Sequence, residues 1–171
     1  MRNSYSEIRR APGYHFPLPA ALRGQTAEHM IACRRMSVAE RMDVFALLAP
    51  ERPDHVALGK ALTLFVERED FGFVWTAFDD NASIVGCVLV SFAISTEAGG
   101  LVACLDDIVV FPDARRTGVG TDLLETLATH VRAMDIVGMR TSVPRASGLG
   151  RFFRACGFSV RDDQGFTRTL P

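Results

Sequence analysis

Apolar residues in the first third of the chain recur at the three- and four-residue spacing of an amphipathic helix. Residues 29–36 precede this pattern and have the alternation of a strand. Ser37 and Glu40 form an S-x-x-E capping box, so we expect a helix to begin there and to end at Pro50. Asp54 is a residue type that caps helices, and a second helical pattern with one apolar face follows it.

The spacing of apolar residues changes after the second helix. Aromatic and β-branched residues then form stretches that are typical of strands, with turn residues between them. The predicted elements are strands over 71–78, 84–95 and 101–111, a helix over about 117–134, a strand over 138–143, a short helix over 147–156 and a hairpin around 162–165. This order predicts a mixed α/β domain built around one sheet.

The composition is that of one globular domain with a short preceding arm. The chain has 171 residues, of which 48% are hydrophobic and 23% are charged. Proline and glycine are frequent in residues 1–26, so we assign these to an arm and residues 27–171 to the domain. The formal net charge is -1 and the apolar runs are short, so we expect no nucleic-acid partner and no membrane.

The spacing of cysteines and histidines gives further expectations. The four cysteines are far apart and form no C-x-x-C pair, which predicts reduced thiols in a cytoplasmic protein. The four histidines lack the H-x-x-x-H spacing of a metal site, so no metal is expected. No G-x-S-x-G motif is present, which leaves a serine hydrolase without support.

Residues 106–124 contain the clearest candidate for a binding site. A strand leads into Gly118 and Gly120, where a helix begins and presents unpaired backbone N–H groups. Arg115 and Arg116 add positive charge and forked donors, and the combination suits a phosphate or diphosphate. The alternative is an ordinary glycine-rich turn with surface arginines.

Two other phosphate motifs do not fit this turn. A Walker loop requires a lysine, which the turn lacks. A dinucleotide fingerprint requires a third glycine at the position of Leu123. The pattern that remains is Arg-x-x-Gly-x-Gly.

The stretch from Val110 to Leu124 resembles the acyl-CoA-binding motif of the GNAT superfamily of N-acetyltransferases. The stretch Phe-Phe-Arg-Ala-Cys-Gly-Phe at residues 152–158 resembles the second signature of that family. The resemblance extends over about residues 29–170. It implies an α/β (α+β) fold, with a mixed, mostly antiparallel central sheet that is flanked by helices and splayed at the acyl-CoA cleft.

The resemblance also implies how acetyl-CoA would be held. Backbone groups of the strand before the turn would pair with pantetheine, the amides of residues 116–121 would hold the diphosphate, and two aromatic rings would flank the thiol. The cofactor-binding residues implied in this way are Ile108, Val109, Val110, Arg115, Arg116, Thr117, Gly118, Val119, Gly120, Thr121, Phe152 and Phe153.

The implied oxyanion donor is the backbone N–H of Val110. Asp106 and Asp107 are the candidate general bases because they lie just before the cofactor segment. Adjacent strand residues point to opposite faces, so we expect at most one to face the acceptor unless the strand bulges. In the alternative, one is salt-bridged and the other solvated. Many family members have a tyrosine at the position of Phe153 and an asparagine at the position of Ala146. Unlike tyrosine, Phe153 cannot donate a proton.

These features predict an acyl-CoA-dependent N-acetyltransferase that moves an acetyl group directly to a primary amine of a small molecule or peptide. The alternative is a non-catalytic module that binds or senses acyl-CoA, and a weaker one is a domain that binds ATP or NAD. The acceptor stays open, although Glu67, Glu69 and Asp70 after the second helix could attract a cationic amine. The arm could contribute to a homodimer.

Overall fold

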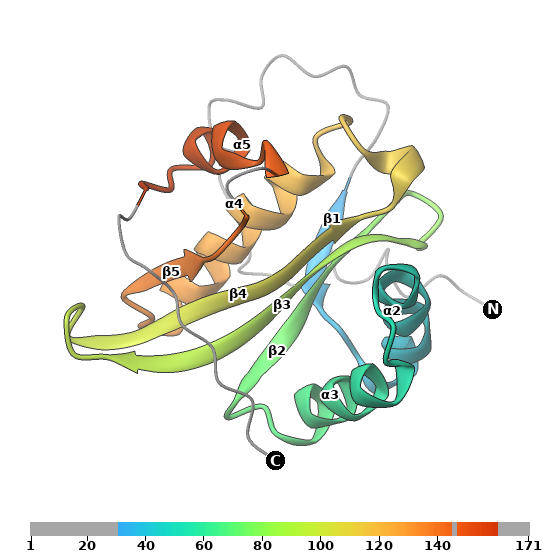
Figure 1. The fold of residues 1–171 in the computed structure, drawn as a ribbon, viewed down its shortest axis with the longest axis horizontal. Helices are drawn as coiled ribbons and strands as arrows, with labels where there is room; N and C mark the ends of the chain where they lie inside the picture. Colours follow the sequence, from blue (N-terminus) through green and yellow to red (C-terminus); the bar gives the residue numbers. More distant parts are fainter. Residues whose placement is uncertain (1–30, 145–146, 161–171) are drawn as a thin grey trace, which may run out of the picture.

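The computed structural model describes residues 31–144 and 147–160, and Figure 1 shows the fold. The predicted arm over residues 1–26, Ala146 and most of the predicted C-terminal hairpin lie outside the described residues. The elements are β1 (Ala32–Arg35), η2 (Val38–Glu40), α2 (Arg41–Leu48), η3 (Ala49–Glu51), α3 (His55–Glu67), β2 (Gly72–Phe78), β3 (Ile84–Ser95), β4 (Gly100–Val110), η4 (Pro112–Ala114), α4 (Val119–Arg132), β5 (Gly138–Thr141) and α5 (Gly150–Ala155).

The five described strands form one open sheet in the order β1-β2-β3-β4-β5. Neighbouring strands are antiparallel except for β4 and β5, which run parallel. This arrangement confirms the predicted mixed, mostly antiparallel sheet. The parallel pair needs a crossover, and the segment that contains α4 supplies it.

Helices cover both faces of the sheet (Figure 1). On one face, Leu123 and Leu127 of α4 pack with Trp75, Val88 and other residues of the first core cluster, to which Phe153 of α5 also belongs. On the other face, α2 and α3 pack a second cluster against β2 and β3. Every residue of β2 is buried because both clusters include residues of this strand.

The predicted helix starts are confirmed at the first two helices. Glu40 accepts a hydrogen bond from the backbone N–H of Ser37 at 2.7 Å, and the capping box is complete. The side chain of Asp54 accepts from the backbone N–H of Ala57 at 2.9 Å and caps α3. These local interactions therefore fix the start of the α2–α3 layer.

Several predicted boundaries differ from the structure; β5, for example, ends at Thr141 and not at residue 143. Helix α4 begins at Val119 because Gly118 before it has φ +102°, and α5 begins at Gly150 because Gly148 has φ +71°. Neither conformation can continue a right-handed helix. Residues 158–160, predicted to open the hairpin, have no regular secondary structure.

Candidate functional site

The middle of β4 marks the place where the sheet opens. Strand β5 pairs with β4 only from Val102↔Gly138 to Leu105↔Thr141. Beyond Leu105, β4 continues to Val110 and keeps β3 as its one partner in the described sheet. One edge of β4 is therefore open over its last residues, which is the splayed geometry that the resemblance implied.

Backbone groups of β4 alternate between β3 and the open edge. The N–H of Phe111 donates to the carbonyl of Val85 at 2.8 Å, so the backbone groups of Phe111 face β3. By the antiparallel alternation, those of Val110 and Ile108 face the open edge, and those of Val109 face β3. Only two of the three residues expected to pair with pantetheine therefore present backbone groups there.

A run of unpaired amides lies at the glycine turn that follows. Within the described part of the chain, no acceptor bonds the backbone N–H groups of residues 116–120. The N–H of Thr121 donates to the carbonyl of Gly118 at 2.9 Å. Thr121 therefore differs from the other amides expected to hold a diphosphate, because its N–H closes the first turn of α4.

The glycines of this turn are required by its shape. Gly118 precedes α4 in a left-handed conformation, and no side chain caps the helix. A Cβ at Gly120 would lie 3.3 Å from the ring of Phe152 and 3.8 Å from Val110. The two sequence signatures, far apart in the chain, therefore meet at Gly120 beside the open end of β4.

The two aromatic residues of α5 have different environments. Phe152 is half-buried against Gly120, whereas Phe153 is 6% exposed and belongs to the first core cluster. The ring of Phe153 also packs edge-on against Phe158, with 5.4 Å between the centroids. The expectation that both rings flank the cofactor thiol is therefore corrected for Phe153, since neighbouring helical residues cannot share one direction.

The two arginines of the turn also differ. Arg115 turns back along β4, where its Nε donates to the carbonyl of Val110 at 2.9 Å and its guanidinium lies 3.6 Å from Glu51. Arg116 is exposed, with φ +67°. Arg115 thus lies at the end of β4, where it neutralises Glu51, and Arg116 is the arginine with the freer side chain.

A β-bulge brings the two candidate bases to the same face of the sheet. Val88 pairs with Ile108 and Val90 pairs with Leu105, so one residue of β3 opposes two residues of β4. Those two residues are Asp106 and Asp107, which lie opposite Leu89. The exception expected for a bulged strand therefore applies here, and the two side chains point to one face of the sheet.

The bonding partners of the two carboxylates identify that face. Asp106 accepts a hydrogen bond from the hydroxyl of Ser91 at 2.9 Å. Asp107 forms an ion pair with Arg52, which follows η3. Burial raises the pKa of Cys87 to about 12, and the charge of Asp107 contributes to this increase. Both aspartates therefore lie on the side of the sheet that α2 and α3 cover in part.

Sequence reasoning missed the partners Arg52 and Ser91. Arg52 is 55 residues from Asp107, and nothing local links them. Ser91 is a polar residue inside an apolar strand pattern, which was an available but weak signal. The register of β3 against β4 was needed to show that Ser91 faces Asp106.

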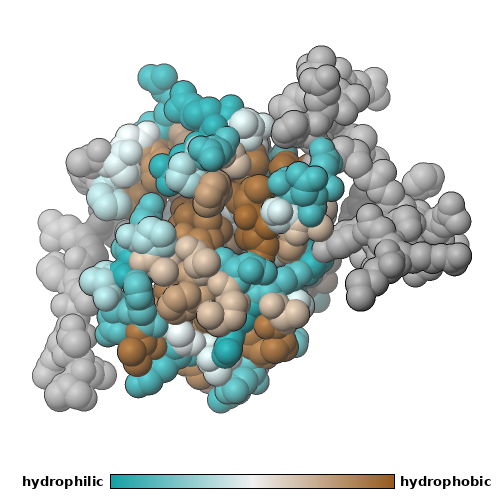
Figure 2. Space-filling model, turned by 90° about the vertical axis from the view of Figure 1, so that its right-hand side faces the viewer, coloured by the Kyte–Doolittle hydropathy of each residue, from teal (hydrophilic) through white to brown (hydrophobic). Residues whose placement is uncertain are grey.

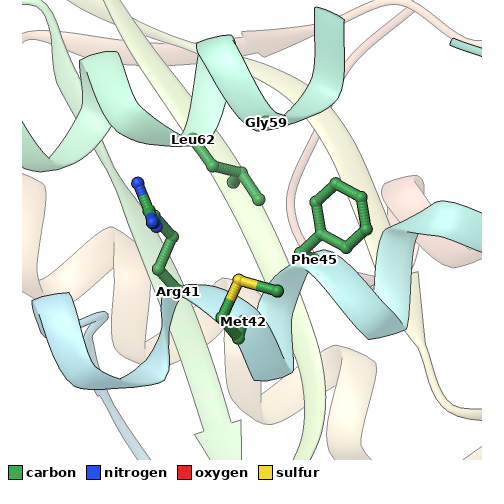
Figure 3. A pocket seen from close by; sticks show the side chains of 5 residues that line it. All are labelled: Arg41, Met42, Phe45, Gly59 and Leu62. Atoms are coloured by element: carbon green, nitrogen blue, oxygen red, sulfur yellow. The ribbon is translucent and has the colours of Figure 1, made fainter. Parts of the chain in front are cut away.

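A separate hollow lies between α2 and α3 (Figure 3). It has a volume of about 290 Å³ and is lined by Arg41, Met42, Phe45, Gly59 and Leu62. Figure 2 shows apolar side chains gathered around a hollow on this side of the molecule. No residue of the glycine turn or of β4 lines it, so it is distinct from the opening beside β4.

With this geometry established, the sequence can be compared with known proteins. The family model "Acetyltransferase (GNAT) domain" matches residues 70–160, more than half of the chain. The chain belongs to the GNAT acetyltransferase family. The match spans the open edge of β4, the glycine turn and α5 of this GNAT protein. A search of curated proteins finds no significant match.

Several solved structures share the fold of this chain. An integron cassette protein from the mobile metagenome of Cole Harbour Salt Marsh has a TM-score of 0.72 at 19% identity, covering 81% of this chain and 90% of that one. The aminoglycoside N-acetyltransferase AAC(6')-Iy, solved with CoA, has a TM-score of 0.70 at 17% identity, and the match covers 83% of this chain and 96% of that one. A ribosomal-protein-alanine N-acetyltransferase from Brucella melitensis biovar Abortus 2308 has a TM-score of 0.64 at 20% identity, and the match covers 84% of this chain and 100% of that one. At such identities the likeness concerns the fold alone.

No helix among residues 31–144 and 147–160 is long and apolar enough to cross a bilayer. The same residues contain no group of three or more histidines, cysteines and acidic residues that could hold a metal ion.

Proposed function

We propose that this GNAT protein transfers an acyl group, acetyl in the simplest case, from acyl-CoA to a primary amine. The single observation that carries the proposal is the run of unpaired amides over residues 116–120, at the end of the open edge of β4. A helix N-terminus of this kind favours anions through its free N–H groups and its dipole. The length of α4, 14 residues, makes that dipole fully developed.

The residues present fit an acyl-CoA molecule. The free amides and Arg116 would bind the diphosphate, and the outward backbone groups of Ile108 would bind pantetheine, while the N–H of Val110 stays available for the thioester carbonyl. Gly120 and Phe152 shape the site between these two regions, since a larger residue than glycine would press on the ring. A related fold, the aminoglycoside N-acetyltransferase, is described as a complex with CoA, which supports this choice of cofactor.

The chemistry would proceed by direct transfer. Acyl-CoA supplies a thioester, whose carbonyl oxygen the N–H of Val110 would stabilise as negative charge develops. Asp106 would accept the proton of the attacking amine, because its carboxylate is exposed and Ser91 is its hydrogen-bond donor. The N–C bond forms, the C–S bond breaks, and the thiolate takes a proton from water. Since a thiol has a pKa near 8.5, it leaves without the tyrosine that Phe153 replaces.

A module that binds acyl-CoA without transferring the acyl group is the second candidate. The observation that favours it is the buried ring of Phe153, which leaves no proton donor at that position. Both candidates predict CoA binding, and turnover with an amine separates them. All four cysteines are free thiols: Cys33, Cys87, Cys104 and Cys156. We therefore propose a reducing compartment, the cytoplasm, for the protein under either candidate function.

Thermal melts of the protein with acetyl-CoA, CoA, NAD or ATP test the cofactor. A ligand at a hundredfold excess over its Kd stabilises the protein by about 2.7 kcal/mol, or on the order of 5–10 °C in Tm. We expect this shift with both CoA species and none with NAD or ATP. A shift with NAD or ATP alone, or no shift with saturating acetyl-CoA, would contradict the proposal. Release of CoA thiol in an amine screen then distinguishes the enzyme from the binding module.

A further inference from the structure

The face of the sheet that holds Asp106 also presents an unneutralised positive group. We propose that the acceptor amine carries an anionic group a few bonds from its nitrogen, and that Arg140 of β5 binds that group. The inference rests on the proposed function, because it assigns the substrate class of the same site. It replaces the idea, drawn from acidic residues alone, that the site attracts a simple cation.

Three side chains form one row across the strands. Ser91 of β3 pairs with Cys104 of β4, and Cys104 pairs with Arg140 of β5. The neighbours of Cys104 along β4, Ala103 and Leu105, belong to the core beneath α4, so Cys104 points to the opposite face. The Nε of Arg140 donates to the sulfur of Cys104 at 3.0 Å, so Arg140 lies on that face as well. Because Ser91 also bonds Asp106, the row joins Arg140 to the candidate base.

Four of the charged groups on this face, Asp106, Asp107, Arg52 and Arg140, are not equivalent. Asp107 is neutralised by Arg52. Asp106 has only the neutral hydroxyl of Ser91 as a hydrogen-bond donor among the described residues. In the same part of the chain, Arg140 has no carboxylate partner, and its contact with Cys104 uses one donor to a weak acceptor. One carboxylate and one guanidinium are therefore left for a ligand.

The spacing of these two groups suits a small molecule. Arg140 is one strand away from β4, and its partner Cys104 is two residues before Asp106. Strands lie about 4.8 Å apart and rise about 3.3 Å per residue, so the two backbone positions are roughly 8 Å apart. The long arginine side chain can shorten this distance. A substrate with an amine at Asp106 and an anion a few bonds away can therefore reach both.

Charge balance argues against a polycationic acceptor. Asp106 and Asp107 contribute two negative charges, and Arg52 and Arg140 contribute two positive ones. A polyamine would bring further cations to these four groups, whose charges already sum to zero, and would meet the guanidinium of Arg140. An acceptor of mixed charge pairs with both free groups instead.

The test uses matched amine pairs with acetyl-CoA as donor and thiol release as readout. One series compares the L-amino acids with their C-terminal amides, and the other compares O-phosphoethanolamine with ethanolamine; spermidine is added as a polycation. We expect at least a tenfold higher kcat/KM for the anionic member of one series, and the series identifies the anion as carboxylate or phosphate. Arg140→Ala should lower kcat/KM for that member at least tenfold and leave its neutral counterpart within about twofold.

Two variants make the result specific. Arg140→Lys keeps the charge without the planar fork, so we expect part of the preference for the anionic amine to return. Arg132→Ala removes an exposed arginine at the end of α4 and should leave the preference unchanged. A preference for spermidine or for the neutral amines, an equal loss for both members in Arg140→Ala, or no turnover in either series would overturn the inference. The acetyl-CoA melt separately reports whether the cofactor part of the proposed function holds.

Discussion

Helices α3 and α4 begin in opposite ways. The side chain of Asp54 accepts from the N–H of Ala57 and closes the start of α3. Helix α4 begins after Gly118, which has no side chain, and the amides of residues 116–120 have no partner in the described chain. A cap contributes about 1 kcal/mol to stability, so an uncapped start is a cost that a bound anion can offset.

The two aspartates of the bulge repeat this contrast at the scale of single side chains. Asp107 is satisfied by Arg52, whereas Asp106 is exposed and, among the described residues, bonds only the hydroxyl of Ser91. The capped helix α3 and the ion-paired Asp107 stabilise the fold. The uncapped start of α4 and the carboxylate of Asp106 lie beside the free edge of β4. The candidate site is therefore built from groups that the protein leaves unsatisfied.

The largest effect is expected when an aspartate, the residue type that caps α3, is introduced before the first residue of α4. In Gly118→Asp, a carboxylate would compete with the diphosphate for the amides, so we expect at least a hundredfold loss of acetyl-CoA affinity, measured by titration calorimetry. Any side chain is strained at the left-handed φ of +102°, so Gly118→Asp should also lower Tm, and the asparagine variant shares this strain. Gly118→Asn has a similar shape without the charge and should lose much less affinity. Equal losses in the two variants would assign the effect to shape.

The next effect concerns the open carboxylate. Asp106→Asn removes the proposed base, and we expect kcat to fall about a hundredfold with acetyl-CoA affinity unchanged. Asp107→Asn breaks only the ion pair with Arg52 and should change kcat less than tenfold, although it lowers Tm. The two variants are to be compared in steady-state kinetics. A larger kcat loss in Asp107→Asn would reverse the roles of the two residues.

A smaller effect is expected at the capped start of α3, and it concerns stability. Asp54→Ala removes the cap of α3 and should lower the free energy of unfolding by about 1 kcal/mol, as measured by urea denaturation. Its affinity for acetyl-CoA should equal that of the wild type. A loss of affinity would mean that the α2–α3 layer controls the cofactor site.

The smallest effect concerns the second aromatic residue of α5. Phe153→Tyr adds a hydroxyl to a ring that lies in the core, so we expect turnover within the same order of magnitude as in the wild type. Stability should fall slightly, because the hydroxyl loses water contacts unless it finds a partner. An increase in kcat of tenfold or more would show that the hydroxyl reaches the leaving thiolate.

Local patterns determined much of this protein. The capping box at Ser37, the cap at Asp54 and the periodicity of the apolar residues predicted the helices and strands, because each of these signals acts over a few residues. The glycine turn also follows from its own sequence, since Gly118 adopts a φ that other residues rarely accept. Each of these features could be read without knowing the fold.

Tertiary structure decided how the site is completed. The bulge that turns Asp106 and Asp107 to one face depends on the register of β3 against β4, and no local pattern specifies that register. The burial of Phe153 and the exposure of Phe152 depend on how α5 packs on α4 and the sheet. Arg52 and Arg140 reach this face from distant segments. The sequence alone therefore determined which turn leaves its amides unpaired, and only the packing of strands and helices determined which charged groups share one face of the sheet.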